Sequence, residues 1–376
     1  MIDLDQIVGQ ERAVADLRQA MAAQRMPHGF IFAGPEGVGR QTTATALAKV
    51  LLCERLGTAP NSGTVPSSAC NECPSCRMME AGSHPDFNLV YKELAAFHED
   101  AQVRNRVMQE LGIDVIDSFL IEPAMRAAAR GRGKVFVVLE AELMSHDAQN
   151  SLLKTLEEPP PGVTIILVAG QAEQLLPTTL SRCRLVRFNY LPRDFVVQRL
   201  AESGMETTEA AFWAAVTGGS LGRSIAMAAQ GLYAIKRDLL ERLAALGGGG
   251  DVDLGEELAG IVDKLANAAV SASKRADGST MAKNLAIRQA TGAMLEIAAS
   301  AYQDALALSA GSDRPLVNAD QAVAVRALAQ RFSSDRLCRI IEHFAQFEEL
   351  LWRNVNPKTV WDNVVISCAS AANLRV

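Results

Sequence analysis

The sequence predicts an α/β domain built on a parallel sheet, followed by all-helical regions. Three observations support this class. A short apolar strand at 30–32 leads through a glycine-rich loop into a helix, which is the order found in phosphate-binding domains. Two further apolar runs, 134–139 and 164–168, are continuous, as is typical of strands buried on both faces. Beyond about Pro192 the strand pattern ends and the spacing of apolar residues is helical.

Along the first half of the chain, the elements follow from this spacing. The strand at 134–139 is preceded by a helical pattern and followed by another, which the prolines at 159–161 end. Residues 185–188 are a candidate for one more strand. The helices that we expect here lie at 10–24, 42–52, 113–130 and 147–156, and a Gly/Pro/Ser/Thr-rich loop lies at 54–69.

Composition and charge exclude several classes of protein. With 376 residues, 49% of them hydrophobic and 21% charged, the chain is globular and long enough for two or three domains. The formal net charge of −6 excludes a protein that is basic overall. The N-terminus is acidic and no apolar run reaches about 18 residues. We therefore expect neither a secretion signal nor a membrane span, and a cytoplasmic location.

The glycine-rich loop has the spacing of a phosphate-binding loop without its full chemistry. Such a loop reads G-x-x-x-x-G-K-[ST], where the Lys reaches the phosphates and the hydroxyl binds Mg²⁺. Here Arg40 takes the Lys position, Gln41 takes the hydroxyl position, and Thr42 comes one residue late. A tight structural turn is the alternative interpretation. The candidate nucleotide-binding residues of this degenerate site are Gly34, Gly37, Gly39, Arg40, Gln41, Thr42 and Glu140.

A second defect lies at the end of the strand at 134–139. ATP-hydrolysing sites of this kind place a metal-holding Asp there, usually followed by a Glu that polarises water. Leu139 occupies the Asp position and cannot coordinate a metal, while Glu140 remains. Because Gln41 and Leu139 remove two independent magnesium contacts, we expect that this chain does not hydrolyse ATP.

Four of the seven cysteines form a cluster in the sequence. Cys70, Cys73 and Cys76 are spaced by two residues, and Cys53 precedes them across the loop. In an intracellular chain this spacing predicts a structural zinc site with four thiolates. An Fe–S cluster is the alternative metal, and unrelated thiols are the third interpretation. The segment 53–76 is thus a zinc-binding insertion in the first domain.

Several stretches together resemble the AAA+ clamp-loader family. The resemblance covers the first half of the chain densely, and the Leu-Leu-Lys-Thr-Leu-Glu-Glu-Pro-Pro run with Ser-Arg-Cys is its most specific part. The stretches are Ile7-Val8-Gly9-Gln10, His28-Gly29-Phe30, the loop 34–42, the four cysteines, His84-Pro85-Asp86, the run 148–160 and the segment 176–183.

The resemblance implies a P-loop α/β AAA+ module with a parallel sheet, a small helical lid and an all-α collar domain that holds a hetero-pentameric ring together. On this sequence the three domains are 1–190, 191–230 and 231–376. Because Arg40, Gln41 and Leu139 depart from the motor pattern, the chain resembles the non-hydrolysing, structural subunit of the bacterial DNA polymerase III clamp loader.

The resemblance also implies a role for Arg182 in Ser181-Arg182-Cys183. It would be an arginine finger presented in trans to the ATP of a neighbouring gamma/tau subunit, whereas the residues alone favour a solvated surface charge. The implied partners are the gamma/tau and delta subunits, the sliding clamp through the complex, and primed DNA without sequence preference. The first alternative is an ATP-hydrolysing gamma/tau-type motor, and the second is an unrelated zinc-containing adaptor.

Direct DNA contact has weaker support in the sequence. Arg126, Arg130, Arg132 and Lys134 lie close together and are a candidate phosphate-backbone contact. A solvated, charged helix end is the interpretation that we favour.

Overall fold

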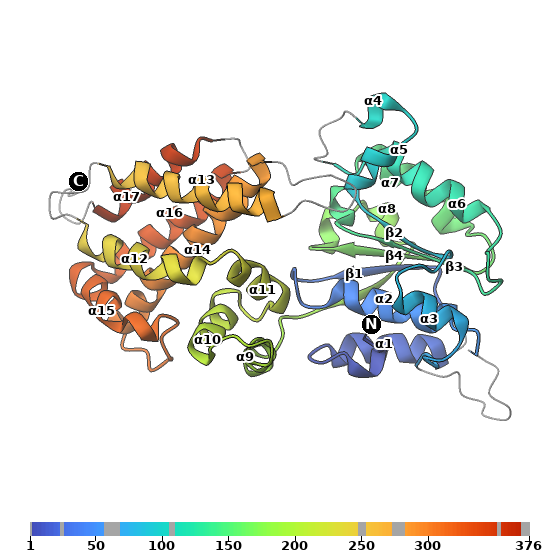
Figure 1. Cartoon of the computed structure of the whole chain (residues 1–376), viewed down its shortest axis with the longest axis horizontal. Coiled ribbons are helices and arrows are strands. Elements are labelled where there is room, and N and C mark those ends of the chain that lie inside the picture. The colour runs from blue at the N-terminus through green and yellow to red at the C-terminus, as the bar shows by residue number, and fades with distance from the viewer. Residues whose placement is uncertain are drawn as a thin grey trace. The chain divides into compact units, whose positions relative to one another are not determined.

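The computed structural model describes residues 2–22, 26–55, 68–104, 110–246, 253–272, 283–351 and 355–369 (Figure 1). The chain forms two compact units, Met1–Pro192 and Arg193–Val376. The first contains all the described strands and the second contains only helices among its described residues. This confirms the predicted class, a parallel α/β module followed by all-helical regions.

The first unit is built on a five-stranded parallel sheet with the order β2-β3-β4-β1-β5 among the described residues. Its strands are β1 (Gly29–Ala33), β2 (Phe87–Val90), β3 (Lys134–Val138), β4 (Val163–Ala169) and β5 (Arg184–Arg187). Its helices are α1 (Glu11–Ala22), α2 (Arg40–Leu52), α3 (Pro74–Glu80), α4 (Ala101–Arg104), α5 (Ile113–Ile116), α6 (Glu122–Met125), α7 (His146–Glu157) and α8 (Pro177–Leu180). Short 3-10 turns are η1 (Leu4–Gln6), η2 (Lys92–Phe97), η4 (Ala141–Leu143) and η5 (Ala172–Gln174), and η3 (Asp117–Ile121) is a π-helical segment.

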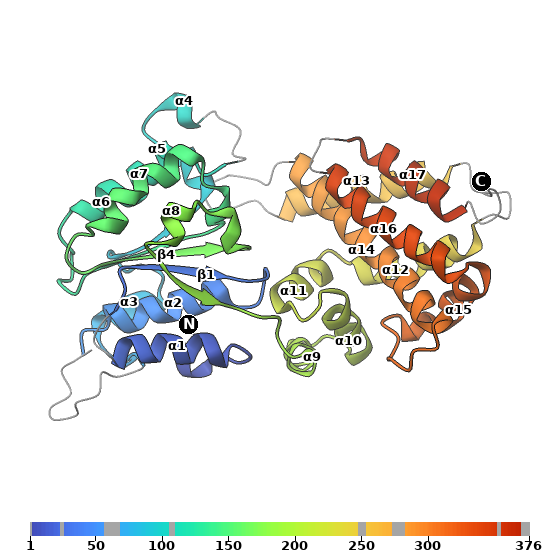
Figure 2. The same ribbon diagram turned by 180° about the vertical axis from the view of Figure 1, so that it is seen from behind.

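Helices cover both faces of this sheet. Figures 1 and 2 show α1, α2 and α3 on one face and α5, α6, α7 and α8 on the other. Every residue of β1, β3 and β4 is buried, as expected for central strands between two layers of helices. On the α7 face, Ile31, Phe136 and Ile165 pack with Leu152 and Leu156 in one core cluster. The carboxyl ends of these strands therefore form one rigid edge.

Two elements differ from the sequence-based expectation. Strand β2 was not predicted, because it is a partly exposed edge strand and only Val90 of its four residues is buried. The helix expected over 113–130 ends at Met125, and the chain continues without helical structure to β3. The buried Asp86 accepts hydrogen bonds from the backbone N–H groups of Ala129 (2.7 Å) and Arg130 (2.8 Å). These two N–H groups therefore have hydrogen-bond partners although the chain is not helical at this point.

The second unit consists of α9 (Arg193–Glu202), α10 (Thr207–Val216), α11 (Leu221–Ala229), α12 (Leu232–Ala245), α13 (Leu254–Ala272), α14 (Lys283–Ser309), η6 (Ala319–Gln321), α15 (Ala322–Arg331), α16 (Ser334–Leu351) and α17 (Pro357–Ala369). Its core includes the fully buried Trp213, Trp361 and Tyr302. The glycine break expected at 247–250 lies outside the described residues. No helix in the described part of the chain is long and apolar enough to cross a membrane.

Candidate functional site

The glycine-rich loop joins β1 to α2, as the sequence predicts. Gly34, Gly37 and Gly39 have φ values of +154°, +71° and +98°, a region that side chains disfavour. A Cβ atom at Gly34 would lie 2.3 Å from the carbonyl oxygen of Phe188, whereas one at Gly39 would meet nothing within 4 Å. The glycine at 34 is thus required by packing against the segment after β5, independently of any phosphate.

We expect Gly34→Ala to lower the free energy of unfolding by about 2–3 kcal/mol, because it adds a backbone clash to an unfavourable φ. Gly39→Ala is the matched control, with a cost of about 1 kcal/mol from φ alone. Chemical denaturation of both variants measures the difference. Equal losses of stability in the two variants would show that the protein relieves the clash with Phe188 without a cost in free energy.

Arg40 occupies the position of the phosphate-binding Lys and is turned onto the protein itself. Its guanidinium donates a hydrogen bond to the carbonyl oxygen of Ala169 at the end of β4. Burial lowers the pKa of Arg40, and the negative charges of Glu142 and Glu36 oppose that shift. Gln41 and Thr42 are exposed in the first turn of α2. The guanidinium of Arg40 is therefore already hydrogen-bonded to the end of β4.

Glu142, which sequence reasoning did not select, lies close to the same strand end. Its Oε1 accepts the backbone N–H of Gly170 at 2.9 Å, and its Oε2 is buried without a hydrogen-bond partner. A Cβ at Gly170 would lie 2.9 Å from Glu142 Oε1, so the glycine leaves the space that the carboxylate fills. The signal in the sequence was Gly170 itself, a residue without a side chain directly after β4.

Glu140, the predicted water-polarising residue, is directed elsewhere. It follows β3 with φ +48° and pairs with Lys92 Nζ at 2.7 Å, beyond the end of the neighbouring strand β2. Leu139, in the position of a metal-holding Asp, donates its backbone N–H to Val90. Of the two carboxylates that follow β3, it is thus Glu142 that acts on Arg40, while Glu140 is held at the opposite side of β3.

Arg182 lies just before β5 with every nitrogen of its guanidinium engaged. Its Nε donates to Glu157 Oε1 at 2.7 Å, and Nη2 contacts the same oxygen. Its Nη1 donates to the carbonyl oxygen of Thr178 at 2.8 Å and to Ser181 Oγ at 3.2 Å. The side chain is nevertheless 31% exposed, and Glu157 is 49% exposed. Arg182 is therefore a held but accessible surface cation.

Two neighbouring side chains, the partly buried Cys183 and the buried Gln149, fix the backbone that presents Arg182. A Cβ at Gly29 would lie 2.8 Å from Cys183 Sγ, so this thiol packs directly against the start of β1. Burial raises the pKa of Cys183 to about 12, which keeps the thiol neutral. Gln149, a buried residue of α7, accepts the backbone N–H of Leu176 at 2.8 Å. These contacts make α8 and the following residues a fixed support.

The four predicted metal ligands come together. The Sγ atoms of Cys53, Cys70, Cys73 and Cys76 all lie within 4.8 Å of one another, and none forms a disulfide. Tetrahedral zinc with Zn–S bonds of about 2.3 Å requires sulfurs about 3.8 Å apart, and Cys70 Sγ and Cys76 Sγ are 3.9 Å apart. In the described part of the chain the candidate ligand set consists of these four thiols, and four thiols at this spacing fit a structural zinc ion.

Backbone geometry directs these sulfurs to one point. Cys73 caps the N-terminus of α3, where Pro74 is the first helical residue, and its Sγ accepts the N–H of Cys76 at 3.4 Å. Cys70 Sγ accepts the N–H of Cys73 at 3.4 Å. Burial raises the pKa of Cys70, but hydrogen bonds from the backbone N–H groups of Glu72 and Cys73 and with the thiols of Cys53 and Cys73 together lower that pKa to about 6. Donors of this kind stabilise thiolates.

Hydrogen bonds connect this cluster to the sheet. Ser75, in α3, contacts His84 Nε2 at 3.1 Å, and His84 Nδ1 accepts the backbone N–H of Asp86 at 3.1 Å. Asp86 in turn accepts the amides of Ala129 and Arg130 before β3. His84-Pro85-Asp86 thus links the cysteines to the β2 edge.

The basic residues at 126–134 do not form a free patch. Arg130 pairs with Glu54 at 2.5 Å, and Lys134 is buried, with its Nζ donating to the carbonyl oxygen of Pro123 at 2.6 Å. Arg126 is exposed, 3.9 Å from Glu122. Two of the four basic groups are thus committed to structure, which favours the interpretation as a charged chain segment.

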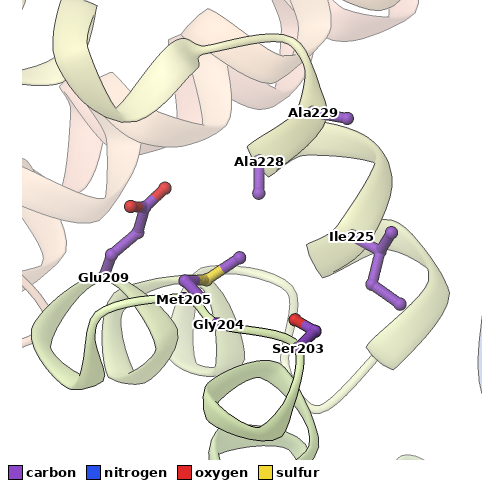
Figure 3. A pocket seen from close by; sticks show the side chains of 7 residues that line it. All are labelled: Ser203, Gly204, Met205, Glu209, Ile225, Ala228 and Ala229. Atoms are coloured by element: carbon purple, nitrogen blue, oxygen red, sulfur yellow. The ribbon is translucent and has the colours of Figure 1, made fainter.

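A cavity of about 360 Å³ lies in the second unit, away from every predicted site residue. Met205, from the turn after α9, and Ile225 and Ala228, from α11, form much of its wall (Figure 3). Its one carboxylate, Glu209, already accepts the indole N–H of Trp213 at 3.0 Å. The lining offers no set of groups for a nucleotide or a metal ion.

Two family models match the chain. One, described as DNA polymerase III, delta subunit, matches residues 9–192, and the other, described as DNA polymerase III, delta subunit, C terminal, matches residues 263–366. The first spans the α/β unit with the glycine-rich loop, the cysteines and Arg182. The second spans the helical region in which the sequence alone offered no motif.

Curated relatives match over about half of the chain. DNA polymerase III subunit tau of Escherichia coli is 35% identical over 47% of this chain and 24% of its own length. DNA polymerase III subunit delta' of Bacillus subtilis is 29% identical over 51% of each, and subunit delta' of E. coli is 29% identical over 59% of this chain and 60% of its own length. The matched region thus spans between a quarter and three fifths of these relatives.

Proposed function

This chain belongs to the DNA polymerase III clamp-loader family, and from that premise we propose that it is the delta-prime-type, non-hydrolysing subunit of the loader. In this role it is a structural part of a hetero-pentameric ring. It works with gamma/tau and delta subunits, and through the complex with the sliding clamp and primed DNA. Its own nucleotide site is degenerate.

The observation that supports this proposal most is the state of the nucleotide site. Arg40 is bonded to Ala169, Glu142 fills the space at Gly170, and Glu140 is paired with Lys92. Phosphoryl transfer needs a basic group on the phosphates, a held Mg²⁺ and a positioned water. The residues that would supply these three requirements are either replaced by other residue types or bonded to other groups of this chain.

Arg182 is proposed as the group that this chain contributes to catalysis by a neighbour. An arginine that stabilises charge developing on the transferred phosphate works in trans when a partner presents it. Arg182 is accessible, and Cys183 and Gln149 fix the backbone beneath it, so the segment that presents this cation is preorganised. Its target is the ATP of an adjoining gamma/tau-type subunit.

The cysteine cluster is proposed as a structural zinc site. When bound, zinc supplies a rigid cross-link among Cys53, Cys70, Cys73 and Cys76 and no catalysis, because a closed four-thiolate site has no open position. The cross-link joins the end of α2 to α3, and the hydrogen bonds through His84 extend it to the sheet edge. Its proposed purpose is stability of the α/β module.

The proposed lid (191–230) and collar (231–376) are strongly connected within the second unit. Lys236 of α12 is 1% exposed, pairs with Asp320 at 2.6 Å and lies 3.9 Å from the ring centre of Phe212 in α10. Arg223 of α11 pairs with Glu296 of α14. Such cross-links suit a subunit that acts as a fixed part of a ring.

The purified chain alone should not hydrolyse ATP. We expect Mg²⁺-dependent phosphate release at the background level of a buffer control, because the magnesium contacts and a free basic group are missing. The 35% identity to a tau subunit keeps the ATP-hydrolysing motor as the second candidate. Mg²⁺-dependent turnover by the isolated chain clearly above that background would establish the motor instead.

A further inference from the structure

Arg182 is not simply exposed, because its guanidinium is already satisfied by this chain. A guanidinium has five N–H donors, and four hydrogen bonds here use the Nε–Nη2 edge on Glu157 and the Nη1 group on Thr178 and Ser181. At most one N–H of Nη2 is left. Bidentate recognition of a phosphate needs two parallel N–H groups on one edge. Arg182 must therefore give up a present partner before it can bind a phosphate in this way.

The edge held by Glu157 is the one that a phosphate would most readily take. Glu157 is an anion, as a phosphate is, whereas Thr178 and Ser181 offer neutral oxygens from the residues just before Arg182 in the chain. Both Arg182 and Glu157 are partly exposed, and ion pairs of that kind contribute little, so one anion can replace the other at small cost. Glu157 ends α7, which Gln149 connects to α8, so it is held in place while the exchange occurs.

We propose that Glu157 is the resting partner of Arg182, a carboxylate that occupies the arginine until the phosphate of a neighbouring subunit's nucleotide displaces it. This inference rests on the proposed in-trans role of Arg182 and adds its regulation. Glu157 is a positioning residue that acts only through Arg182. It sets how readily the arginine becomes available, and the pair makes the neighbour's ATP compete with this chain's own carboxylate.

The test uses the complex reconstituted with its gamma/tau-type and delta-type partners. Glu157→Gln keeps the side chain's size and removes the competing charge. Part of the turnover of the complex depends on Arg182 and is lost in Arg182→Ala. For that part we expect kcat/KM for ATP to rise about two- to fivefold in Glu157→Gln, the change that corresponds to the free energy of one exposed ion pair. Damage to the fold can only lower this value, so a rise separates release of Arg182 from a structural effect.

Glu158→Gln is the matched control, because Glu158 is the next residue, is exposed, and makes no side-chain hydrogen bond or ion pair within the described part of the chain. It should leave kcat/KM unchanged, and Glu157→Gln should have no effect when Arg182 is already alanine. An unchanged or lower kcat/KM for Glu157→Gln in an otherwise responsive complex would overturn this inference alone. Unchanged turnover in Arg182→Ala would overturn the proposed function as well.

The isolated chain offers a second readout that needs no partner. In protein labelled with ¹⁵N-arginine, the Nε–Hε resonance of Arg182 should move when Glu157 becomes Gln and stay in place when Glu158 becomes Gln. A resonance that is indifferent to Glu157→Gln would show that the pair is not formed, and the inference would fail without reference to ATP turnover.

Discussion

Arg182→Ala in the assembled complex should lower ATP turnover at the adjoining subunit by about 10³–10⁵-fold, the range seen when such an arginine is removed from related nucleotide hydrolases. The physical reason is that charge develops on the transferred phosphate and a fixed cation stabilises it more in the transition state than in the ground state. The measurement is DNA-stimulated phosphate release by the complex.

The chain itself should tolerate this change. Arg182 is 31% exposed in its pair with Glu157, so its loss should cost at most about 1 kcal/mol of stability, which thermal unfolding of the isolated variant measures. Arg187→Ala is the matched control, since Arg187 ends β5, which begins two residues after Arg182, is 68% exposed and contacts Glu173 only at 3.9 Å. If both variants support equal turnover, Arg182 is a surface charge and the in-trans role is wrong.

The parts of the fold that the sequence predicts are those with a continuous physical signal. Strands β1, β3 and β4 are buried on both faces, so their apolar runs are unbroken and their positions follow directly. Strand β2 is an edge strand with one buried residue and gives no such run. Helix α6 ends at Met125, and the carboxylate of Asp86 accepts the amides of Ala129 and Arg130 beyond it, 43 and 44 residues away in the sequence. Local spacing cannot predict a contact of that separation.

The candidate site, like the fold, is only partly predictable from the sequence. The defects at Arg40, Gln41 and Leu139 are visible in the sequence, because each is a residue type unable to do what the motif requires. The contacts that the neighbouring side chains make instead cannot be predicted from the sequence. That Glu142 rather than Glu140 faces the end of β4, and that Glu157 holds Arg182, depends on side-chain directions set by η4 and by the end of α7.

The cysteine cluster carries the other large expected effect. Purified protein should contain one zinc ion per chain by metal analysis and show no visible absorption, which separates zinc from an Fe–S cluster. The double variant Cys73→Ser with Cys76→Ser should lose the ion and unfold at a clearly lower temperature, because structural zinc contributes about 10–16 kcal/mol of apparent binding free energy. Cys338→Ser is the control, since Cys338 is an exposed free thiol of α16.

Loss of the zinc ion should also affect residues outside the cysteine cluster, because α3 is connected to them by hydrogen bonds. Ser75 of α3 contacts His84, whose ring accepts the amide of Asp86, and Asp86 holds the amides of Ala129 and Arg130. When the cross-link is removed, hydrogen exchange at these last two amides should accelerate, while exchange in the central strand β4 should change far less, since β4 is buried between two neighbours. Normal stability and unchanged exchange in the double variant would mean that the four thiols only fill space.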